Sequence, residues 1–321
     1  MTTAAEETAR PSIGTLERAL TAALGGLEQV AVTERSPNWY SSWHPSEVLT
    51  CDAASQALQV LCKYDLPWSQ EIHGLPAGVS YEADAYRLAV EPCGLSAPRS
   101  YGLFSDDRTG AAWLMLEFLA GSCRLTKSTE PGEIGRAARW IGLFHRFHDR
   151  REIPPADRLN RHDEATLEAC VARAQSACEP LRAEYPWLSG LADEYEGVFC
   201  DLFLRRPTVI HGEYYPKNIL VRERTVFPID WERAGVSAGE IDLAALTEGH
   251  WKPQDVRIAT ESYAEARWGA DVPDDFTECL NAARVYLHMA ALGNEPNEPF
   301  KPGAKWRFGQ LELAAAERGL L

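Results

Sequence analysis

The pattern of hydrophobic and polar residues divides the chain near residue 121. In the N-terminal third, apolar residues come in short runs that are typical of strands. Two such runs, at 46–52 and 57–65, are separated by small residues at 53–55, which predicts an antiparallel hairpin. The uninterrupted apolar run at 113–119 predicts a buried strand. Gly121 and Ser122 follow that run and have the composition of a hinge.

Helical periodicity dominates after residue 130. Within 132–148, the residues Ile134, Ala137, Ile141 and Phe144 recur at intervals of three and four, which predicts a helix with one buried stripe. Further helices are predicted at 13–25, 80–91, 163–204 and 240–321. Short strands are predicted at 208–212, 218–221 and 226–231. The order of elements therefore indicates an α+β fold, β-rich at first and mostly helical afterwards.

Composition limits the classes of function. The chain has 321 residues, 45% of them hydrophobic, which is enough for two separate cores. A net charge of −15 argues against a nucleic-acid partner and permits a cationic one. No apolar run is long enough for a membrane span, so no membrane partner is expected. Residues 1–12 have the composition of a flexible tail and lack the pattern of a signal peptide. The eight cysteines show no zinc spacing, and we expect reduced thiols in a cytoplasmic protein.

The segment 208–246 carries the strongest chemical signal. It places Glu213 after one predicted strand, Asn218 before the next, and Asp230 after a third. Phosphoryl transfer needs a carboxylate that accepts the proton of an attacking hydroxyl. It also needs oxygen ligands that hold Mg²⁺ against the nucleotide phosphates. Glu213 can fill the first role, and Asn218 and Asp230 the second.

Three motifs in this segment resemble those of the aminoglycoside phosphotransferase and choline kinase family. His211-Gly-Glu213-Tyr-Tyr-Pro-Lys-Asn218 resembles the family's H-G-D-x-x-x-x-N catalytic loop. Ile-Asp230-Trp-Glu resembles its metal motif, and Asp242-Leu-Ala resembles the segment that follows. The resemblance implies that His211 and Asp242 support the catalytic loop and that Glu213, Asn218 and Asp230 are the catalytic residues.

The resemblance also implies a protein-kinase-like fold with two lobes. The small β-rich N-lobe, expected at 13–120, would bind the nucleotide. The larger helical C-lobe, expected at 121–321, would carry the catalytic loop, the metal site and the acceptor pocket. The implied activity is transfer of the γ-phosphoryl of ATP or GTP to a hydroxyl of an antibiotic-like, amino-alcohol or sugar acceptor, with Mg²⁺ as cofactor. The alternative is a catalytically weak nucleotide-binding pseudokinase.

The same resemblance assigns residues upstream of the motifs. Lys63, near the end of the second hairpin run, matches the strand lysine that holds the α- and β-phosphates. Glu82 matches the helix glutamate that pairs with this lysine. Glu117, Phe118 and Leu119 match the hinge, whose backbone groups contact the nucleobase.

Two features depart from the family pattern. Glu213 stands where the family usually has aspartate, and its extra methylene moves the carboxylate by about 1.5 Å. The site is then either active with a displaced geometry or degenerate. No G-x-G-x-x-G precedes Lys63, and the polar run from Ser41 to Ser46 occupies that place, either as a phosphate cover or as an ordinary surface turn.

Several assignments remain open at this level. Residues 240–280 hold ten acidic and three basic side chains, which favours an amine-bearing acceptor or only a solvated helix face. Glu232 is expected to support the metal ligands from outside or to face solvent, and Lys217 to be exposed. His145 and His148 are expected in the core of a helix. The identity of the acceptor, the choice between ATP and GTP, and the oligomeric state are not determined by the sequence.

Overall fold

The computed structural model describes residues 10–25, 29–38, 45–53, 56–65, 71–73, 75–106, 111–128, 130, 132–191, 202, 206–294 and 296–321. The chain forms two compact units. The first contains Met1–Ser128 and Asn218–Arg233, and the second contains Thr129–Lys217 and Ala234–Leu321. The first unit extends beyond the predicted boundary at residue 121 and also includes residues 218–233, because residues 220–221 pair with residues 123–124. The predicted α+β class is confirmed.

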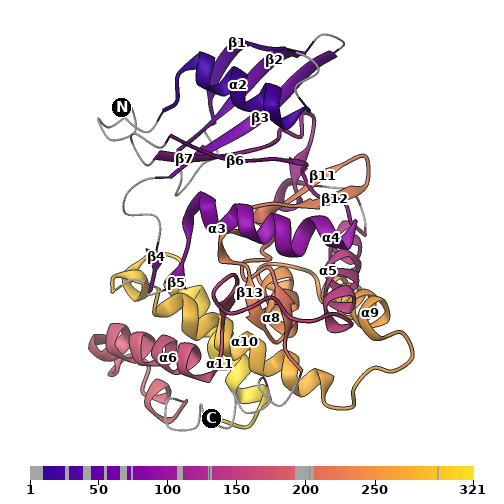
Figure 1. Cartoon of the computed structure of the whole chain (residues 1–321). Coiled ribbons are helices and arrows are strands. Elements are labelled where there is room, and N and C mark those ends of the chain that lie inside the picture. The colour runs from indigo at the N-terminus through magenta and orange to yellow at the C-terminus, as the bar shows by residue number, and fades with distance from the viewer. Residues whose placement is uncertain are drawn as a thin grey trace. The chain divides into compact units, whose positions relative to one another are not determined.

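An antiparallel five-stranded sheet forms most of the first unit (Figure 1). Its strand order is β1 (Val30–Pro37), β2 (Ser46–Ala53), β3 (Gln56–Tyr64), β7 (Ala111–Glu117) and β6 (Ser100–Asp106). The predicted hairpin is confirmed as β2 and β3, although residues 54 and 55 of its turn lie outside the described residues. Helix α2 (Ile13–Ala23), capped by Ser12, packs Leu16 and Leu20 against the sheet.

A second helical segment of this unit is less regular than predicted. The single helix expected at 80–91 is instead α3 (Gly78–Ala85), a π-helical turn η1 (Tyr86–Val90) and α4 (Glu91–Cys93). Helix α3 begins where the amide of Val79 donates to Asp65 Oδ1 at 2.8 Å. The short two-stranded ribbon β4 (Glu71–Ile72) and β5 (Leu75–Pro76) precedes it.

A small three-stranded sheet explains why residues 218–233 belong to the first unit. Its order is β12 (Thr225–Pro228), β11 (Ile219–Arg222) and β8 (Cys123–Arg124). Strand β8 follows the hinge and continues into η2 (Leu125–Lys127). The helical turn η5 (Trp231–Arg233) follows β12. The two C-terminal predicted strands are therefore confirmed as a hairpin, and their pairing with β8 is tertiary.

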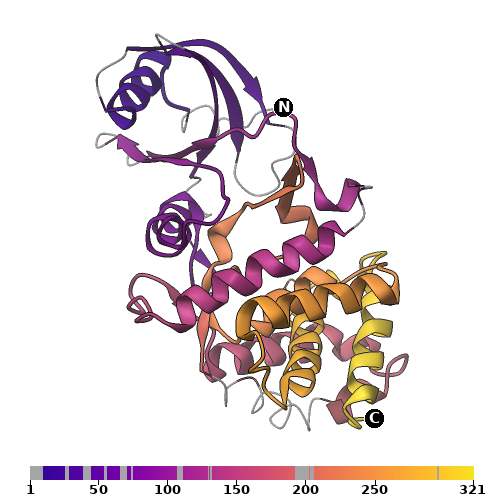
Figure 2. The same ribbon diagram turned by 90° about the vertical axis from the view of Figure 1, so that its right-hand side faces the viewer.

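The second unit is mostly helical. The predicted stripe of α5 (Glu133–Asp149) is buried and packs along α9 (Pro253–Trp268) (Figure 2). A Cβ on Gly142 would lie 2.8 Å from the backbone oxygen of Tyr263, so the close approach of these helices requires glycine there. The other helical elements are α6 (Glu164–Cys178), η3 (Glu179–Leu181), η4 (Pro216–Asn218), α8 (Glu240–Thr247), α10 (Phe276–Leu292), η6 (Glu298–Phe300) and α11 (Ala304–Glu317).

A short sheet in this unit holds the start of the catalytic motif. Strand β13 (Gly235–Ser237) pairs antiparallel with β10 (Thr208–Ile210) and parallel with β9 (Asn160–Arg161). All three residues of β10 are buried, as the apolar run predicts. The motif residues that follow β10 therefore leave the sheet from a fixed point.

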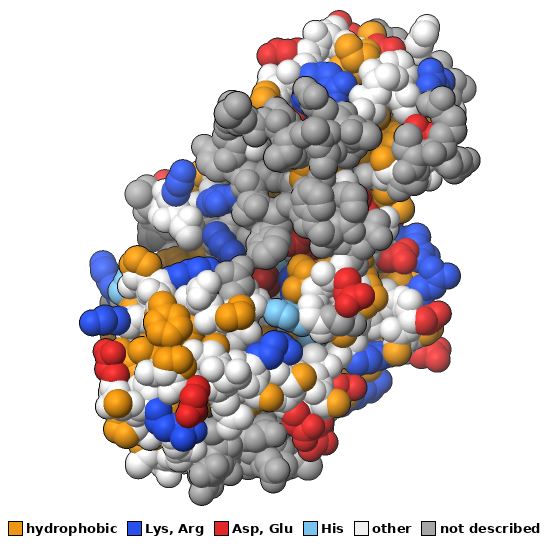
Figure 3. Space-filling view, turned by 90° about the vertical axis from the view of Figure 1, so that its left-hand side faces the viewer, with side chains coloured by type: hydrophobic (Ala, Val, Ile, Leu, Met, Phe, Trp, Pro, Cys, Tyr) orange, Lys and Arg blue, Asp and Glu red, His pale blue; other side chains and the backbone are white. Residues whose placement is uncertain are grey.

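The described surface carries charges of both signs, and the described cysteines form no disulfides. On the face drawn in Figure 3, Lys and Arg side chains are interspersed with Asp and Glu side chains over the helical region. The seven described cysteines are all free, and five of them are buried. Among the described residues, no helix combines the length and the apolar character needed to cross a membrane.

Candidate active site

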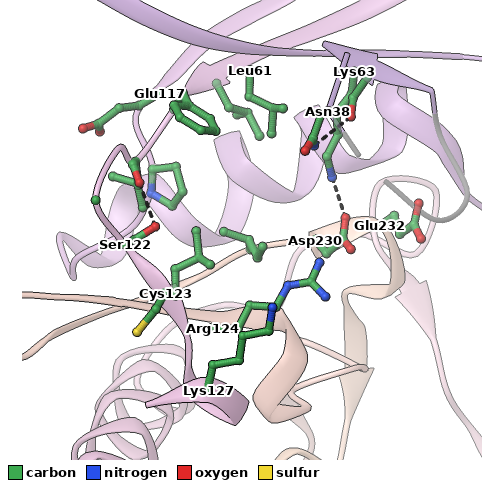
Figure 4. Close-up of a pocket in the computed structure, with 18 residues that line it drawn as sticks. Asn38, Leu61, Lys63, Glu117, Ser122, Cys123, Arg124, Lys127, Asp230 and Glu232 are labelled. Atoms are coloured by element: carbon green, nitrogen blue, oxygen red, sulfur yellow. Dashed lines mark hydrogen bonds and ion pairs between the residues drawn. The ribbon is translucent and has the colours of Figure 1, made fainter. Parts of the chain in front are cut away.

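A cavity of 310 Å³ lies within the first unit (Figure 4). Strand β3 contributes Lys63, and the segment after β12 contributes Asp230. The predicted hinge Glu117, Phe118 and Leu119 forms part of the same wall. The structure thus brings five of the predicted nucleotide and metal residues to one cavity, whose volume falls in the usual range for a small-molecule site.

The ammonium of Lys63 bridges two carboxylates. Its Nζ lies 2.8 Å from Glu82 Oε2 and 2.5 Å from Asp230 Oδ1. Glu82 is fully buried on α3, and its Oε1 also accepts the backbone N–H of Trp231 at 3.3 Å. Burial alone would lower the pKa of Lys63, but Asp230 and Glu82 outweigh it and raise that pKa well above its ordinary value. The lysine therefore stays charged and points into the cavity.

Asp230 has an unusual backbone conformation. Its φ is 71°, in the left-handed region that few residues other than glycine adopt. Such a conformation costs on the order of 1–3 kcal/mol and persists where the surrounding structure imposes it. Here it directs the carboxylate toward Lys63 (Figure 4). Strain at a residue that carries chemistry is a pattern of functional sites.

Asn218 and Asp230 lie at the two ends of the hairpin formed by β11 and β12. The backbone oxygen of Asn218 accepts the N–H of Ile229 at 2.9 Å, so Asn218 faces the residue before Asp230. Asn218 is buried, and so is Glu232, which lines the cavity; of the two alternatives for Glu232, burial excludes exposure to solvent, and support of the metal ligands stays a prediction. Amide and carboxylate oxygens are the donors that Mg²⁺ prefers.

These residues fit a magnesium site that the nucleotide completes. The described part of the chain holds no group of three or more His, Cys, Asp or Glu side chains arranged for a metal ion. Mg²⁺ in phosphoryl-transfer sites is commonly bound by one or two carboxylates together with substrate phosphates and water. Asp230 and Asn218 would hold the ion in that manner, with Glu232 nearby in the cavity wall.

The hinge presents one free donor. The amides of Glu117 and Phe118 donate to the oxygens of Arg99 and Gln59, at 2.8 and 3.1 Å. The Leu119 amide makes no hydrogen bond to any described residue, although Leu119 itself is buried in the cavity wall. A buried amide without a partner is costly, and a ligand that accepts a hydrogen bond satisfies it.

Further residues line the cavity. Ser46, the last residue of the polar run that the sequence offers as a phosphate cover or a surface turn, is one of them, and Asn38 is another; residues 41–44 of that run lie outside the described residues. Arg124 and Lys127 extend from β8 and η2 into the same space (Figure 4). The only sequence signal for these two cations is their position just after the hinge glycine.

Residues 211–217 of the first motif belong to the second unit, and Asp242 holds their start. The backbone amides of His211 and Gly212 donate to the two carboxylate oxygens of Asp242, at 2.7 and 3.0 Å. The side chain of His211 is buried, and its Nδ1 accepts the amide of Glu213 at 3.3 Å. Gly212 has a φ of 81°, which explains the glycine in the motif. The backbone of Glu213 is therefore fixed through His211 to a buried carboxylate.

Burial raises the pKa of Asp242 to about 6. His211 and the two amide donors oppose this effect by favouring the ionised carboxylate. Asp242 is fully buried, so its charge depends on these partners. Of the predicted site residues, the structure places His211, Glu213 and Asp242 in the second unit, and the others in the first.

A comparison with protein-family profiles identifies the family of the chain. The profile of a family described as "Phosphotransferase enzyme family" matches residues 70–278, well over half of the chain. A comparison with curated protein sequences finds no significant match.

Several solved structures share the fold at low sequence identity. A choline/ethanolamine kinase family protein from Mesorhizobium loti aligns with a TM-score of 0.61 and 18% identity, over 96% of this chain and 97% of that chain. A choline kinase from Streptococcus pneumoniae gives 0.63 and 14%, over 94% and 99%. An aminoglycoside 2'-phosphotransferase, solved as a GDP complex, gives 0.61 and 12%, over 96% and 98%.

At these identities the solved structures establish the protein-kinase-like fold alone. The family match covers the strand-helix segment of Glu82, the hinge and all three motifs. Neither comparison supports the alternative of a pseudokinase. The chain belongs to the phosphotransferase enzyme family.

Proposed function

We propose that the protein is a magnesium-dependent kinase that transfers the γ-phosphoryl of ATP or GTP to a hydroxyl of a small molecule. The observation that carries this proposal is the cavity in which Lys63 bridges Glu82 and Asp230. A charged lysine, an oriented carboxylate and a hinge with a free amide are the parts that bind and align a nucleoside triphosphate.

Five residues that line the cavity have a role in this proposal, together with Asn218. The Leu119 amide donates to the nucleobase edge, and Lys63 contacts the α- and β-phosphates. Asp230 and Asn218 hold Mg²⁺, which neutralises charge on the phosphates when it is bound. Arg124 and Lys127 add positive charge to a cavity that lacks a glycine-rich loop. Because the hinge reads the base through the backbone, both ATP and GTP are candidate donors.

Glu213 is the proposed acceptor of the proton from the attacking hydroxyl. Its backbone is held by His211, and His211 is held by Asp242. A fixed loop matters because catalysis by positioning tolerates little displacement of the base. The longer glutamate side chain implies an acceptor hydroxyl that sits farther from the loop backbone than an aspartate would require.

We propose an acceptor that carries an amine, on the basis of the acidic segment 240–280. One of these acidic side chains pairs with a cation from outside the segment, since Glu248 lies 2.9 Å from Arg307. Glu240 lies 3.4 Å from Arg267, which is already one of the three basic residues of the segment. The acidic excess is therefore one charge smaller than the sequence count, and a neutral polyol is the competing class. Salt dependence of kcat/KM separates the two classes, since only a cationic acceptor is attracted electrostatically.

The direct test is a coupled assay of ADP or GDP release against a panel of amino alcohols, aminoglycosides and sugars. Wild-type protein with Mg²⁺ should turn over at least one acceptor, and Asp230→Asn should not. Chelation of Mg²⁺ should abolish release. Acceptor-dependent release that is unchanged in Asp230→Asn would overturn the assignment of the site.

A further inference from the structure

A chain of hydrogen bonds runs behind the catalytic loop, entirely within the second unit. Arg267 Nη1 donates to the hydroxyl of Tyr263 at 2.8 Å. That hydroxyl lies 2.9 Å from His145 Nδ1, and His145 Nε2 lies 3.1 Å from Asp242 Oδ2. We call these four residues, Arg267, Tyr263, His145 and Asp242, the loop-anchoring network.

The direction of the hydrogen bonds follows from the charges. Burial, aided by Arg267, lowers the pKa of His145 to about 3, so its ring is neutral near neutral pH. An ionised Asp242 has no hydrogen to donate, so its Oδ2 acts as an acceptor. Nε2 of His145 must therefore carry the proton of this hydrogen bond. Nδ1 is then an acceptor and receives the hydroxyl hydrogen of Tyr263, whose oxygen accepts from Arg267. One tautomer of His145 satisfies every member.

The far end of the network is fixed by carboxylates. Arg267 contacts Asp149 through Nε and Nη2, at 3.0 and 3.3 Å. Burial alone would lower the pKa of Arg267, but Tyr263, Glu240 and Asp149 raise it, so the guanidinium keeps its charge and its direction. A Cβ at Gly239 would lie 2.6 Å from both Arg267 Nη1 and His145 Nδ1. The network therefore fills the space beside the start of α8.

Few other charged groups act on Asp242. Among the described residues, His211 and His162 favour its ionised form from the loop and from the segment after β9. Tyr214, on the loop, is buried, and Asp242 contributes to raising its pKa. Helix α10 also packs on α8, but its His288 contacts Arg307 instead. From α5, His145 Nε2 lies within hydrogen-bond distance of the Asp242 carboxylate.

We propose that His145 and Tyr263 are positioning residues of the catalytic loop, which hold Asp242 in the ionised form that accepts the amides of His211 and Gly212. Neither residue touches a substrate in this proposal. They act through Asp242 on the backbone that carries Glu213. The inference rests on the proposed function only in treating that loop as catalytic, and its anchoring can be tested without any acceptor.

The test is amide hydrogen exchange of His211 and Gly212 in the full chain between pH 5 and 8, corrected for intrinsic exchange. In the wild type, protection should fall as pH drops through about 6, where Asp242 becomes protonated. His145→Phe removes a donor to the carboxylate, so the midpoint should rise by about one pH unit. Tyr263→Phe should shift it in the same direction by less.

Two variants are controls. His148→Phe replaces another buried histidine of α5, which packs edge-on against Phe144, and should lower stability without moving the midpoint. Asp242→Asn should abolish the pH-dependent step. A step that persists in Asp242→Asn, or equal midpoints in His145→Phe and His148→Phe, would overturn the proposal. If His145→Phe does not fold, Tyr263→Phe decides.

Turnover provides a second readout. With any acceptor found active, the acid limb of the kcat profile should move with the exchange midpoint, while the KM for nucleotide stays within about twofold of the wild type. A purely structural role would lower kcat at all pH values equally. Absence of turnover in the wild type would overturn the proposed function and leave the exchange result to decide this inference.

Discussion

The ammonium of Lys63 and the carboxylate of Asp230 lie 2.5 Å apart, although 167 positions separate them in the chain. Glu82 contacts the same ammonium from α3. Two carboxylates therefore share one positive charge at the wall of the cavity. Loss of the lysine would leave both carboxylates facing each other, one of them fully buried.

Replacing Lys63 should therefore be costly, and the cost should depend on Glu82. We expect Lys63→Met to destabilise the protein by about 3–5 kcal/mol, because it leaves Glu82 buried and unpaired. Lys63→Met combined with Glu82→Gln should recover part of that loss, giving a coupling of about 1–3 kcal/mol. Urea unfolding of the four proteins measures the cycle.

The exposed pair of Arg87 and Asp84, at 2.8 Å on the same helical segment, is a matched control. A double-mutant cycle on this pair should give a coupling energy of about 0–0.5 kcal/mol, since surface ion pairs contribute little to stability. Additive effects of the Lys63 and Glu82 variants, within error, would mean that the pair does not act as a unit.

Asp230 can be tested without disturbing its backbone. Asparagine tolerates a positive φ better than alanine does, so Asp230→Asn should keep the melting temperature close to that of the wild type. The variant should lose acceptor turnover and bind the magnesium nucleotide more weakly. Calorimetric titration measures the affinity. Glu117→Gln, at the hinge, changes the charge of the same cavity and should retain turnover.

Glu213 distinguishes a working site from a degenerate one. Glu213→Gln preserves the shape of the side chain and removes the proton acceptor, so kcat should fall by about 10²–10⁴-fold. The affinity for nucleotide should be nearly unchanged. Glu213→Asp should also be harmful, because the shorter side chain does not reach a hydroxyl placed for glutamate. Higher kcat in Glu213→Asp than in the wild type would contradict a site adapted to glutamate.

The buried Asp242 predicts a definite pH dependence of stability. Its pKa is about 6 in the folded protein and 3.8 ordinarily, so the unfolded chain releases this proton first as pH rises. The free energy of unfolding should therefore fall between about pH 4 and 6, by on the order of 3 kcal/mol from this group. Asp242→Asn should lack this component, which the difference between the two unfolding profiles isolates.

Much of the candidate site could be predicted from the sequence, because its motifs are local. The spacing of His211, Glu213 and Asn218 fixes a strand, a turn and a second strand within a few residues. The stripe of α5 is equally local, since the periodicity of apolar residues alone decides which face is buried. The π-helical turn that interrupts the predicted 80–91 helix could not be predicted, because the residues of this turn show no sequence pattern that differs from that of an α-helix.

The sequence by itself determined the class of fold, the family motifs and the residue types of the site. Only the tertiary structure decided which side chains share the cavity. Arg124, Lys127 and Glu232 belong to it because β8 pairs with β11, which brings the segment after the hinge to the hairpin that carries Asp230. The contact of His145 with Tyr263 joins positions 118 residues apart. Such contacts follow from the packing of whole elements, and no local pattern of hydrophobic and polar residues encodes them.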